Sequence, residues 1–274
     1  MCGQLCVSRA VPPLKPATRL YVAADLAAGL AVALAPAQAH QLRNVLRLAP
    51  GAAVSLFNGR DGEFLACIAE LGKGSAVVTV TERTRPQAAE GGLRLAFAPI
   101  KRARLEFLVE KATELGVAAL QPVWTARTQV ERVNLERLQA HALEAAEQSE
   151  RLTVPVVHEP ITLSALLAQW PPERHLILCD ESGRAPPIAE ALRADRVSPG
   201  GATVLVGPEG GFTETELDGL AKLPFVTPVG LGPRVLRADT ACLAALAVVQ
   251  AVAGDWATAR ARNTAASGSP PFGR

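Results

Sequence analysis

Two loops rich in glycine and proline carry the residues best suited to chemistry. The first, residues 207–212, follows the apolar run 204–206, which predicts a buried strand. The second, residues 230–238, leads into an almost wholly apolar helix. Gly210 and Gly211 let backbone N–H groups approach a ligand closely, because glycine has no Cβ. Either loop alone is explained by a tight turn. Two such loops entering helices favour a ligand pocket at the carboxyl edge of a sheet.

Polar residues beside these loops suggest how a pocket would be framed. Thr213 and Glu216 have the spacing of a capping box, so we expect a helix to begin there. Arg237 follows two apolar residues, and an arginine so close to a buried loop usually has an anionic partner. That partner is either a substrate or a nearby carboxylate such as Asp239.

Basic residues gather at several predicted loops and helix starts. Each cluster alone is explained as ordinary solvated surface, whereas several of them around one sheet edge indicate contacts with phosphate groups. The clusters are Arg43 with Arg47, Lys101 with Arg102 and Arg104, Arg127 with Arg132, and Arg151.

The composition excludes several classes of function. A net charge of +2 does not diagnose a nucleic-acid partner, and 4% aromatic residues argue against an RNA reader built on stacking. Five scattered cysteines and four scattered histidines lack metal-ligand spacing, which favours reduced thiols and no zinc site. We expect no secretory signal in residues 1–18, and the apolar run 241–253 is too short to span a bilayer roughly 30 Å thick.

The order of elements predicts an α/β protein with a small antiparallel β-barrel before a parallel-sheet domain. Short strands separated by Asn-Gly and Gly-x-Gly turns indicate the barrel, and alternating strands and helices after residue 93 indicate the sheet. The expected strands are residues 19–22, 53–57, 63–71, 75–81, 93–97, 119–123, 176–179, 204–206 and 225–229. The expected helices are residues 40–48, 101–115, 135–148, 162–170 and 188–194, with two more beginning at 213 and 239. The expected divisions are a flexible leader (1–17), the barrel (18–83), a linker (84–92), the α/β domain (93–258) and a disordered tail (259–274).

Several of these segments resemble one known family, the RsmE-type ribosomal RNA uridine-N3-methyltransferases of the SPOUT superfamily. The matching segments are residues 19–22, 40–48, 111–117, 144–149, 207–212 and 231–241. The resemblance implies a PUA-like RNA-binding barrel followed by a parallel sheet that ends in a deep trefoil knot. Three positions depart from the pattern: Ala238 and Asp239 stand where Thr and Glu are commoner, and Glu150 replaces a usual glycine.

The resemblance further implies that S-adenosylmethionine binds among three knot loops, without a metal. Backbone amides freed by glycine would bond the adenine edges, and apolar side chains would flank the ring. The implied cofactor-binding residues are Leu178, Asp180, Glu181, Gly207, Pro208, Glu209, Gly210, Gly211, Leu231, Gly232, Val235, Leu236, Arg237 and Ala238.

The implied acceptor is N3 of a uridine in 16S ribosomal RNA of the small subunit. This imide nitrogen is mostly protonated at neutral pH, so transfer needs proton removal or stabilisation of the developing anion. Arg237 is the candidate for stabilising the anion, and Glu209 or a phosphate for accepting the proton. The implied RNA-binding residues are Arg19, His40, Arg43, Arg47, Lys101, Arg102, Arg104, Arg127 and Arg151.

We also expect a cytoplasmic protein, because the scattered cysteines favour reduced thiols. We expect a homodimer, because the helix over residues 240–253 has almost no polar face and the family resemblance points the same way. Two alternatives stay open at this point. A sister enzyme that methylates a ribose 2′-hydroxyl would share the glycine-rich loops, but the barrel and the amino-acid sequence of residues 231–237 argue against it. A non-catalytic RNA-binding protein of the same fold would have lost the cofactor loops, and both are intact here.

Overall fold

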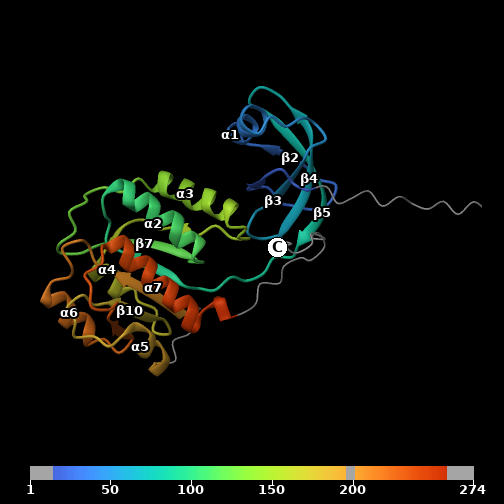
Figure 1. The fold of residues 1–274 in the computed structure, drawn as a ribbon. Coiled ribbons are helices and arrows are strands. Elements are labelled where there is room, and N and C mark those ends of the chain that lie inside the picture. Colours follow the sequence, from blue (N-terminus) through green and yellow to red (C-terminus); the bar gives the residue numbers. More distant parts are fainter. Residues whose placement is uncertain (1–14, 196–200, 258–274) are drawn as a thin grey trace, which may run out of the picture. The chain divides into compact units, whose positions relative to one another are not determined.

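A computed structural model describes residues 15–195 and 201–257 of the chain. The predicted leader falls outside these ranges up to residue 14, and the predicted tail over residues 259–274 falls outside them entirely. The chain divides into two compact units (Figure 1). A barrel unit contains Met1–Glu90 and Glu136–Val156, and a sheet unit contains Gly91–Leu135 and Val157–Arg274.

The barrel unit is built on a five-stranded sheet with the strand order β1-β3-β4-β5-β2. β1 pairs with β3 in parallel, and the other pairs are antiparallel. Side chains such as Leu20, Leu56 and Val78 are fully buried in its core. The sequence predicted four of these strands but missed β2, whose short alanine-rich segment has no strong strand signal. The strands are β1 (Arg19–Tyr21), β2 (Ala31–Leu34), β3 (Ala53–Phe57), β4 (Glu63–Leu71) and β5 (Ala76–Arg85).

The helix predicted over residues 40–48 was wrong in its limits. α1 (Pro36–His40) begins earlier and runs into a single π-helical segment (Gln41–Val45). Arg47 lies beyond this segment with a left-handed φ of +53°. The spacing of Arg43 and Arg47 had suggested that they share one helix face. Because Arg47 lies beyond the helix, they do not.

Burial explains why this helix is short. Leu42 is fully buried, but the side chains of Val45 and Leu46 are 66% and 37% exposed. Only one of the three apolar positions faces the barrel core, so little apolar burial is available to extend the helix.

The sheet unit contains a parallel sheet with the strand order β12-β10-β11-β6-β7-β8, and β9 pairs with β7. β11 is buried at all five positions, as expected for a parallel strand covered on both faces. The long strands confirm the predicted α/β pattern, whereas the two-residue strands β8 and β9 were missed. The strands are β6 (Arg94–Phe97), β7 (Ala119–Trp124), β8 (Val156–Val157), β9 (Ile161–Thr162), β10 (His175–Cys179), β11 (Ala202–Val206) and β12 (Val226–Val229).

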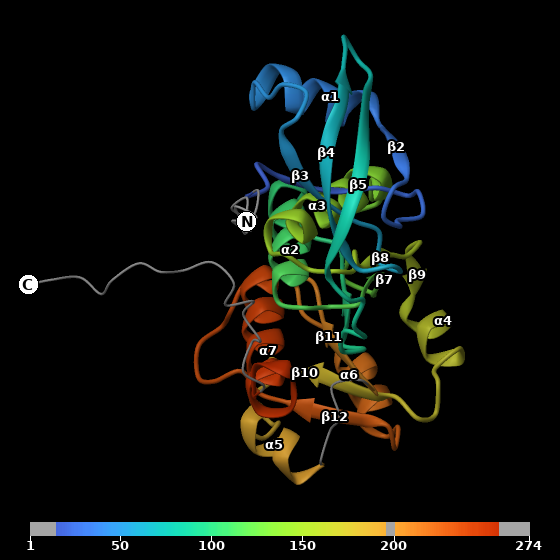
Figure 2. The same ribbon diagram turned by 90° about the vertical axis from the view of Figure 1, so that its right-hand side faces the viewer.

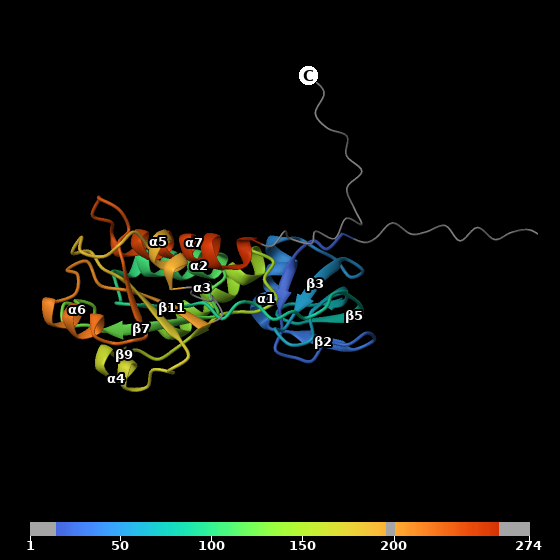
Figure 3. The ribbon, with the colours of Figure 1, turned by 90° about the horizontal axis from the view of Figure 1, so that it is seen from below.

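Helices cover both faces of this sheet. α7 packs against α2, α5, β6 and β11 on one side, while α4 and α6 contribute Leu163, Leu217 and Leu220 to the core on the other. Figure 2 shows α7 and α6 on opposite sides of β10, and Figure 3 shows α4 across the strands from α7. The helices are α2 (Arg102–Glu114), α4 (Leu163–Ala168), α5 (Ile188–Ala194), α6 (Glu214–Ala221) and α7 (Ala238–Ala253).

α3 (Leu135–Gln148) ends in a loop whose backbone conformation is unusual. Glu150 has a φ of +59°, a left-handed conformation in which a Cβ crowds the backbone at a cost of about 1–2 kcal/mol. This is the position where the sequence has glutamate in place of the usual glycine. The backbone at position 150 keeps a conformation that suits glycine, although the residue there is glutamate.

Glu150→Gly is therefore expected to raise the free energy of unfolding by about 1 kcal/mol, through relief of the left-handed strain. Glu150→Ala is the matched control, since it removes the carboxylate and keeps the strained Cβ. Urea unfolding of the three proteins measures the effect. If the alanine variant gained as much stability as the glycine variant, the benefit would come from loss of the charge and not from the backbone.

Candidate active site

Three loops of the sheet unit meet at the carboxyl edge of β10, β11 and β12. β10 lies between the other two strands, with Ile177 paired to Val204 on one side and to Thr227 on the other. Because the three strands are parallel, the segments that follow them must leave the same edge. We call residues 180–187 the first loop, 207–213 the second loop and 230–237 the third loop.

Backbone hydrogen bonds join the first loop to the third. Gly230 N–H donates to Pro186 O at 2.8 Å, and Ile188 N–H donates to Gly230 O at 3.0 Å. Asp180 N–H donates to Val229 O at 2.9 Å, so both ends of the first loop are tied to the end of β12 and the start of the third loop. The two loops therefore act as one backbone layer.

A side chain joins the first loop to the second. The Glu181 carboxylate accepts a hydrogen bond from Phe212 N–H, with an N···Oε1 distance of 2.8 Å. Gly211 has a φ of +67°, and a Cβ there would lie 2.1 Å from the same Oε1. Position 211 thus favours glycine for its left-handed conformation, whereas the Glu181 carboxylate ends a flexible, exposed side chain that can move away from a Cβ.

The other side of the second loop is held by the turn after β7. Arg127 Nη1 donates to Gly210 O at 2.9 Å and to Phe212 O at 3.2 Å. Glu216 Oε1 accepts from Ala126 N–H at 2.9 Å, while its other oxygen completes the predicted capping box of α6. The spacing of the sequence revealed the cap but gave no sign of the bonds to the β7 turn.

The predicted cofactor residues form a buried floor and an open rim. Leu178, Gly207, Pro208 and Ala238 are buried, and Asp180, Gly211, Leu231 and Leu236 are half-buried. Glu181, Glu209, Gly210, Gly232, Val235 and Arg237 are exposed. The structure brings all of them to one edge of the sheet, in three loops that offer backbone polar groups beside apolar side chains. Such a cradle fits a nucleoside with a flat apolar ring and polar edges.

One cavity borders only part of this cradle. Its volume is about 450 Å³, and it is lined by Leu178, by the first loop through Asp180 and residues 184–186, and by residues of α5, α6 and β12. The second and third loops do not line it. A hydrogen bond from the Thr227 hydroxyl to Asp195, 2.6 Å long, joins residues on its wall.

Two thiols lie close behind the loops and are chemically quiet. Burial, aided by the nearby Glu181 charge, raises the pKa of the Cys179 thiol to about 12. Burial also raises the pKa of the Cys242 thiol well above its ordinary value. Neither side chain is a thiolate at neutral pH, so neither supplies a nucleophile.

Arg237 is exposed at the N-cap of α7. The anionic partner considered from the sequence, Asp239, instead faces Arg104 Nη1 at 3.9 Å and accepts a hydrogen bond from Thr240 N–H. Within residues 15–195 and 201–257, the Arg237 guanidinium has no hydrogen bond or ion pair. Its charge therefore remains available to a ligand at the third loop.

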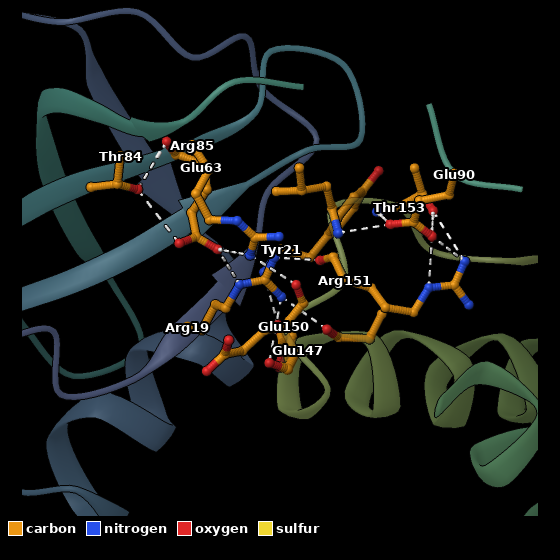
Figure 4. A network of polar contacts seen from close by, with 12 residues as sticks. Arg19, Tyr21, Glu63, Thr84, Arg85, Glu90, Glu147, Glu150, Arg151 and Thr153 are labelled. Atoms are coloured by element: carbon orange, nitrogen blue, oxygen red, sulfur yellow. Dashed lines mark hydrogen bonds and ion pairs between the residues drawn. The ribbon is translucent and has the colours of Figure 1, made fainter. Parts of the chain in front are cut away.

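Arg19, in the barrel unit, is occupied by internal contacts (Figure 4). Its side chain is 10% exposed, forms an ion pair with Glu63 and lies 3.7 Å above the Phe57 ring. It also donates to Ala146 O at 2.8 Å. Burial lowers the pKa of the guanidinium, and the Glu63 carboxylate opposes that shift without cancelling it.

Arg151 is likewise held inside the barrel unit. Its side chain is 7% exposed and is paired with Glu90, which also accepts from the Thr153 hydroxyl (Figure 4). Burial alone would raise the pKa of Glu90, but the Arg151 charge and the hydrogen bonds hold it below its ordinary value. We therefore leave Arg19 and Arg151 out of any RNA-contact surface, because both guanidinium groups are largely buried and paired with carboxylates.

The remaining predicted RNA contacts lie on accessible surface. Arg102 pairs with Glu106 at 2.9 Å on the outer face of α2, where an ion pair contributes little stability. Arg104 faces Asp239, and Arg127 holds the second loop. The exposed members are His40, Arg43, Arg47, Lys101, Arg102 and Arg127.

Two features are absent from the described ranges. No group of three or more histidine, cysteine, aspartate or glutamate side chains there is arranged to hold a metal ion. No helix in those ranges is both long and apolar enough to span a membrane.

Comparison with known proteins assigns the two units to one kind of enzyme. Residues 88–250 match the model of an RNA methyltransferase domain, and residues 34–81 match that of an RNA methyltransferase PUA domain. Ribosomal RNA small subunit methyltransferase E of Rickettsia conorii is 36% identical over 85% of this chain and 94% of its own length. This chain belongs to the ribosomal RNA small subunit methyltransferase E family. Membership confirms the expected PUA-like barrel and RNA methyltransferase domain.

Solved structures of the family support the same assignment. The Neisseria gonorrhoeae enzyme bound to S-adenosyl methionine is 32% identical, covers 87% of this chain and 99% of its own, and superposes with a TM-score of 0.77. A Legionella pneumophila methyltransferase with bound cofactor is 29% identical over 85% of this chain and 97% of its own, with a TM-score of 0.75. The fold of this family member is therefore that of a cofactor-binding RNA methyltransferase.

Removing the Glu90 charge is expected to destabilise the protein strongly at neutral pH. Glu90→Gln leaves the buried Arg151 guanidinium without its anion, a defect that costs roughly 3 kcal/mol of unfolding free energy. Because the pKa of Glu90 is lower in the folded chain than in the unfolded chain, this contribution is full above the ordinary value of 4.5 and is lost as the pH falls through the folded pKa.

Urea unfolding at pH 7 and pH 3 tests this expectation. Glu110→Gln is the control, since Glu110 is 43% exposed and pairs with Lys111 on the surface, where the loss should stay below about 1 kcal/mol. Equal losses in the two variants, or a loss at Glu90 that persists unchanged at low pH, would contradict the buried pair.

Proposed function

We propose that this protein transfers a methyl group from S-adenosylmethionine to N3 of a uridine in 16S ribosomal RNA of the small subunit. One observation carries the proposal: three loops at the carboxyl edge of a parallel sheet are fastened together in a chain of a ribosomal RNA methyltransferase family. A solved member of that family holds S-adenosyl methionine. The domain limits expected from the sequence and a trefoil knot at the third loop belong to the same proposal. β12 lies at the edge of the sheet, next to β10, and the following helix α7 packs on β11 and β6 further inside the sheet. This path of the chain supports the knot.

The cofactor fits the three-loop cradle. The N–H groups of Gly211, Phe212 and Thr213 are bonded inside the protein, which leaves those of the exposed Glu209 and Gly210 for a ligand. Leu231 and Leu236, both half-buried, offer apolar surface for an adenine ring from the third loop. We assign cofactor binding to the loop residues predicted from the sequence apart from Arg237, which we assign to the chemical step, with Glu181 acting on the second loop through Phe212.

The chemistry requires that uracil N3 lose a proton and form a bond to carbon. S-adenosylmethionine supplies a methyl group on a sulfonium, a reactive carbon whose bond to sulfur breaks as the new bond forms. Arg237 is placed to donate hydrogen bonds to a uracil oxygen as negative charge develops, a gain made mainly in the transition state. Glu209, exposed on the second loop, is the proposed proton acceptor.

Arg237→Ala is expected to slow methyl transfer by about 10²-fold or more under single-turnover conditions with saturating RNA and cofactor. Both binding constants should stay nearly unchanged, because the side chain makes no contact that shapes the third loop. Arg234→Ala, in the same exposed loop, is the matched control. A collapse of cofactor affinity with an unchanged saturated rate would place Arg237 in the pocket wall instead of the chemical step.

RNA contact is assigned to the accessible basic residues. Arg43 and Arg47 lie on the barrel unit near the exposed Val45 and Leu46, which gives that surface both charge and apolar area. Lys101 and Arg102 lie at the start of α2 in the sheet unit. These side chains can reach phosphate oxygens without breaking a buried ion pair.

A homodimer is the proposed assembly. Along α7, Leu243, Ala244, Ala247 and Val248 are only half-buried within one chain, although all are apolar. The neighbouring Val235 is 98% exposed at the third loop. A second copy covering α7 would remove this apolar area from water and close the third loop at the same time.

Light scattering at micromolar concentration should give twice the mass of one chain, and Leu243→Glu should give the monomer mass. Ser164→Glu, on the exposed surface of α4, is the control and should leave the dimer intact. A wild-type protein that stays monomeric would contradict the assembly.

The reaction itself is tested by incubating the purified protein with small ribosomal subunits from a strain that lacks it. Mass spectrometry of the digested ribosomal RNA should find 3-methyluridine at one position only. A 2′-O-methylated nucleoside, or no new modification, would overturn the proposal.

The free thiols of Cys67, Cys179 and Cys242 suit the proposed cytoplasmic location, where thiols stay reduced.

A further inference from the structure

The turn after β7 is built to hold one side chain in place. Thr125 N–H donates to the Thr128 hydroxyl at 3.0 Å, and the two threonine hydroxyls lie 2.9 Å apart. Thr128 N–H returns a hydrogen bond to Thr125 O at 3.2 Å. These bonds fix the backbone of residues 125–128 and so fix the position from which Arg127 extends.

Arg127 uses that position to hold the second loop through its carbonyl groups. A single guanidinium nitrogen bonds both Gly210 O and Phe212 O, at 2.9 and 3.2 Å. The Arg127 side chain also packs on Gly210. A Cβ added at position 210 would lie 3.4 Å from the Cβ of Arg127. Loop carbonyls that point to Arg127 leave the intervening Gly211 in its left-handed conformation.

Glu181 completes the grip from the opposite side. It accepts from Phe212 N–H, while Arg127 donates to the carbonyl oxygen of the same residue. The Arg127 guanidinium binds the two carbonyl oxygens, and the Glu181 carboxylate binds the Phe212 N–H group. Together they favour one orientation of these peptide groups. The amides of the second loop are thereby aligned before any ligand arrives.

We propose that Arg127 is a positioning residue that sets the conformation of the second loop for S-adenosylmethionine, and not a phosphate contact for RNA. The inference rests on the proposed function of the three-loop cradle. The two roles predict opposite results, because a phosphate contact affects RNA affinity and its salt dependence. A positioning residue affects the loop in the free protein and the affinity for cofactor.

The first measurement is hydrogen exchange of the protein without ligand. Arg127→Ala should speed exchange of the amides at residues 211–213 about tenfold, and Arg127→Lys should fall between it and wild type, since an ammonium can replace one of the two bonds. Arg193→Ala, an exposed arginine on α5, is the control and should match wild type. Unchanged exchange in Arg127→Ala would overturn the inference whether or not the protein is a methyltransferase.

The second measurement is calorimetric titration with S-adenosylmethionine, followed by RNA binding at several salt concentrations. We expect Arg127→Ala to bind cofactor roughly tenfold more weakly, and to bind RNA with an unchanged salt slope. Glu181→Ala should weaken cofactor binding similarly, while Glu181→Gln keeps the acceptor and much of the affinity. A salt slope lower by about one unit, with cofactor affinity intact, would assign Arg127 to RNA. If wild type bound no cofactor, the proposed function would fail, while the exchange result would still decide the role of Arg127.

Discussion

The parallel register of β10, β11 and β12 is the constraint on which the proposed active site depends. Parallel strands that are paired side by side must release their following segments at one edge, so three loops far apart in the sequence meet there. Backbone bonds between Gly230 and the first loop, and the Glu181 carboxylate on Phe212 N–H, turn that meeting into a fixed arrangement. The apolar strands below, above all the fully buried β11, supply the rigid base.

Charge is used differently in the two units. In the barrel unit, Arg19 pairs with Glu63 and bonds the carbonyl groups of Ala146 and Arg151, which ties that segment to β1 (Figure 4). Arg151 pairs with Glu90, in the segment that follows β5. Removing one partner of such a pair is costly, whereas the pair itself adds modest stability. In the sheet unit, Arg127 and Arg237 are exposed, and Arg127 holds the second loop. The same residue type thus has opposite roles, decided by burial.

Much of the fold could be predicted from the sequence wherever the helical or strand spacing of apolar residues matched the positions that are buried. β3, β4, α3 and α5 have the expected limits, because most of their apolar side chains are at least partly buried. The helix over residues 40–48 failed because Val45 and Leu46 face solvent, which no spacing reveals. The loops of the site were recognisable from their glycines, but the partners of Arg127 and Arg151 were not. Arg127 bonds a residue 83 positions away and Arg151 one 61 positions away, and such pairings follow from topology alone.

The most direct test of the three-loop cradle is a hydrogen-exchange footprint of S-adenosylmethionine on the wild-type protein. Saturating cofactor should slow exchange in residues 180–187, 207–213 and 230–238 together, while the barrel strands and the cavity wall at β12 and α6 exchange as before. Protection centred on that cavity, or on only one of the three loops, would contradict the account.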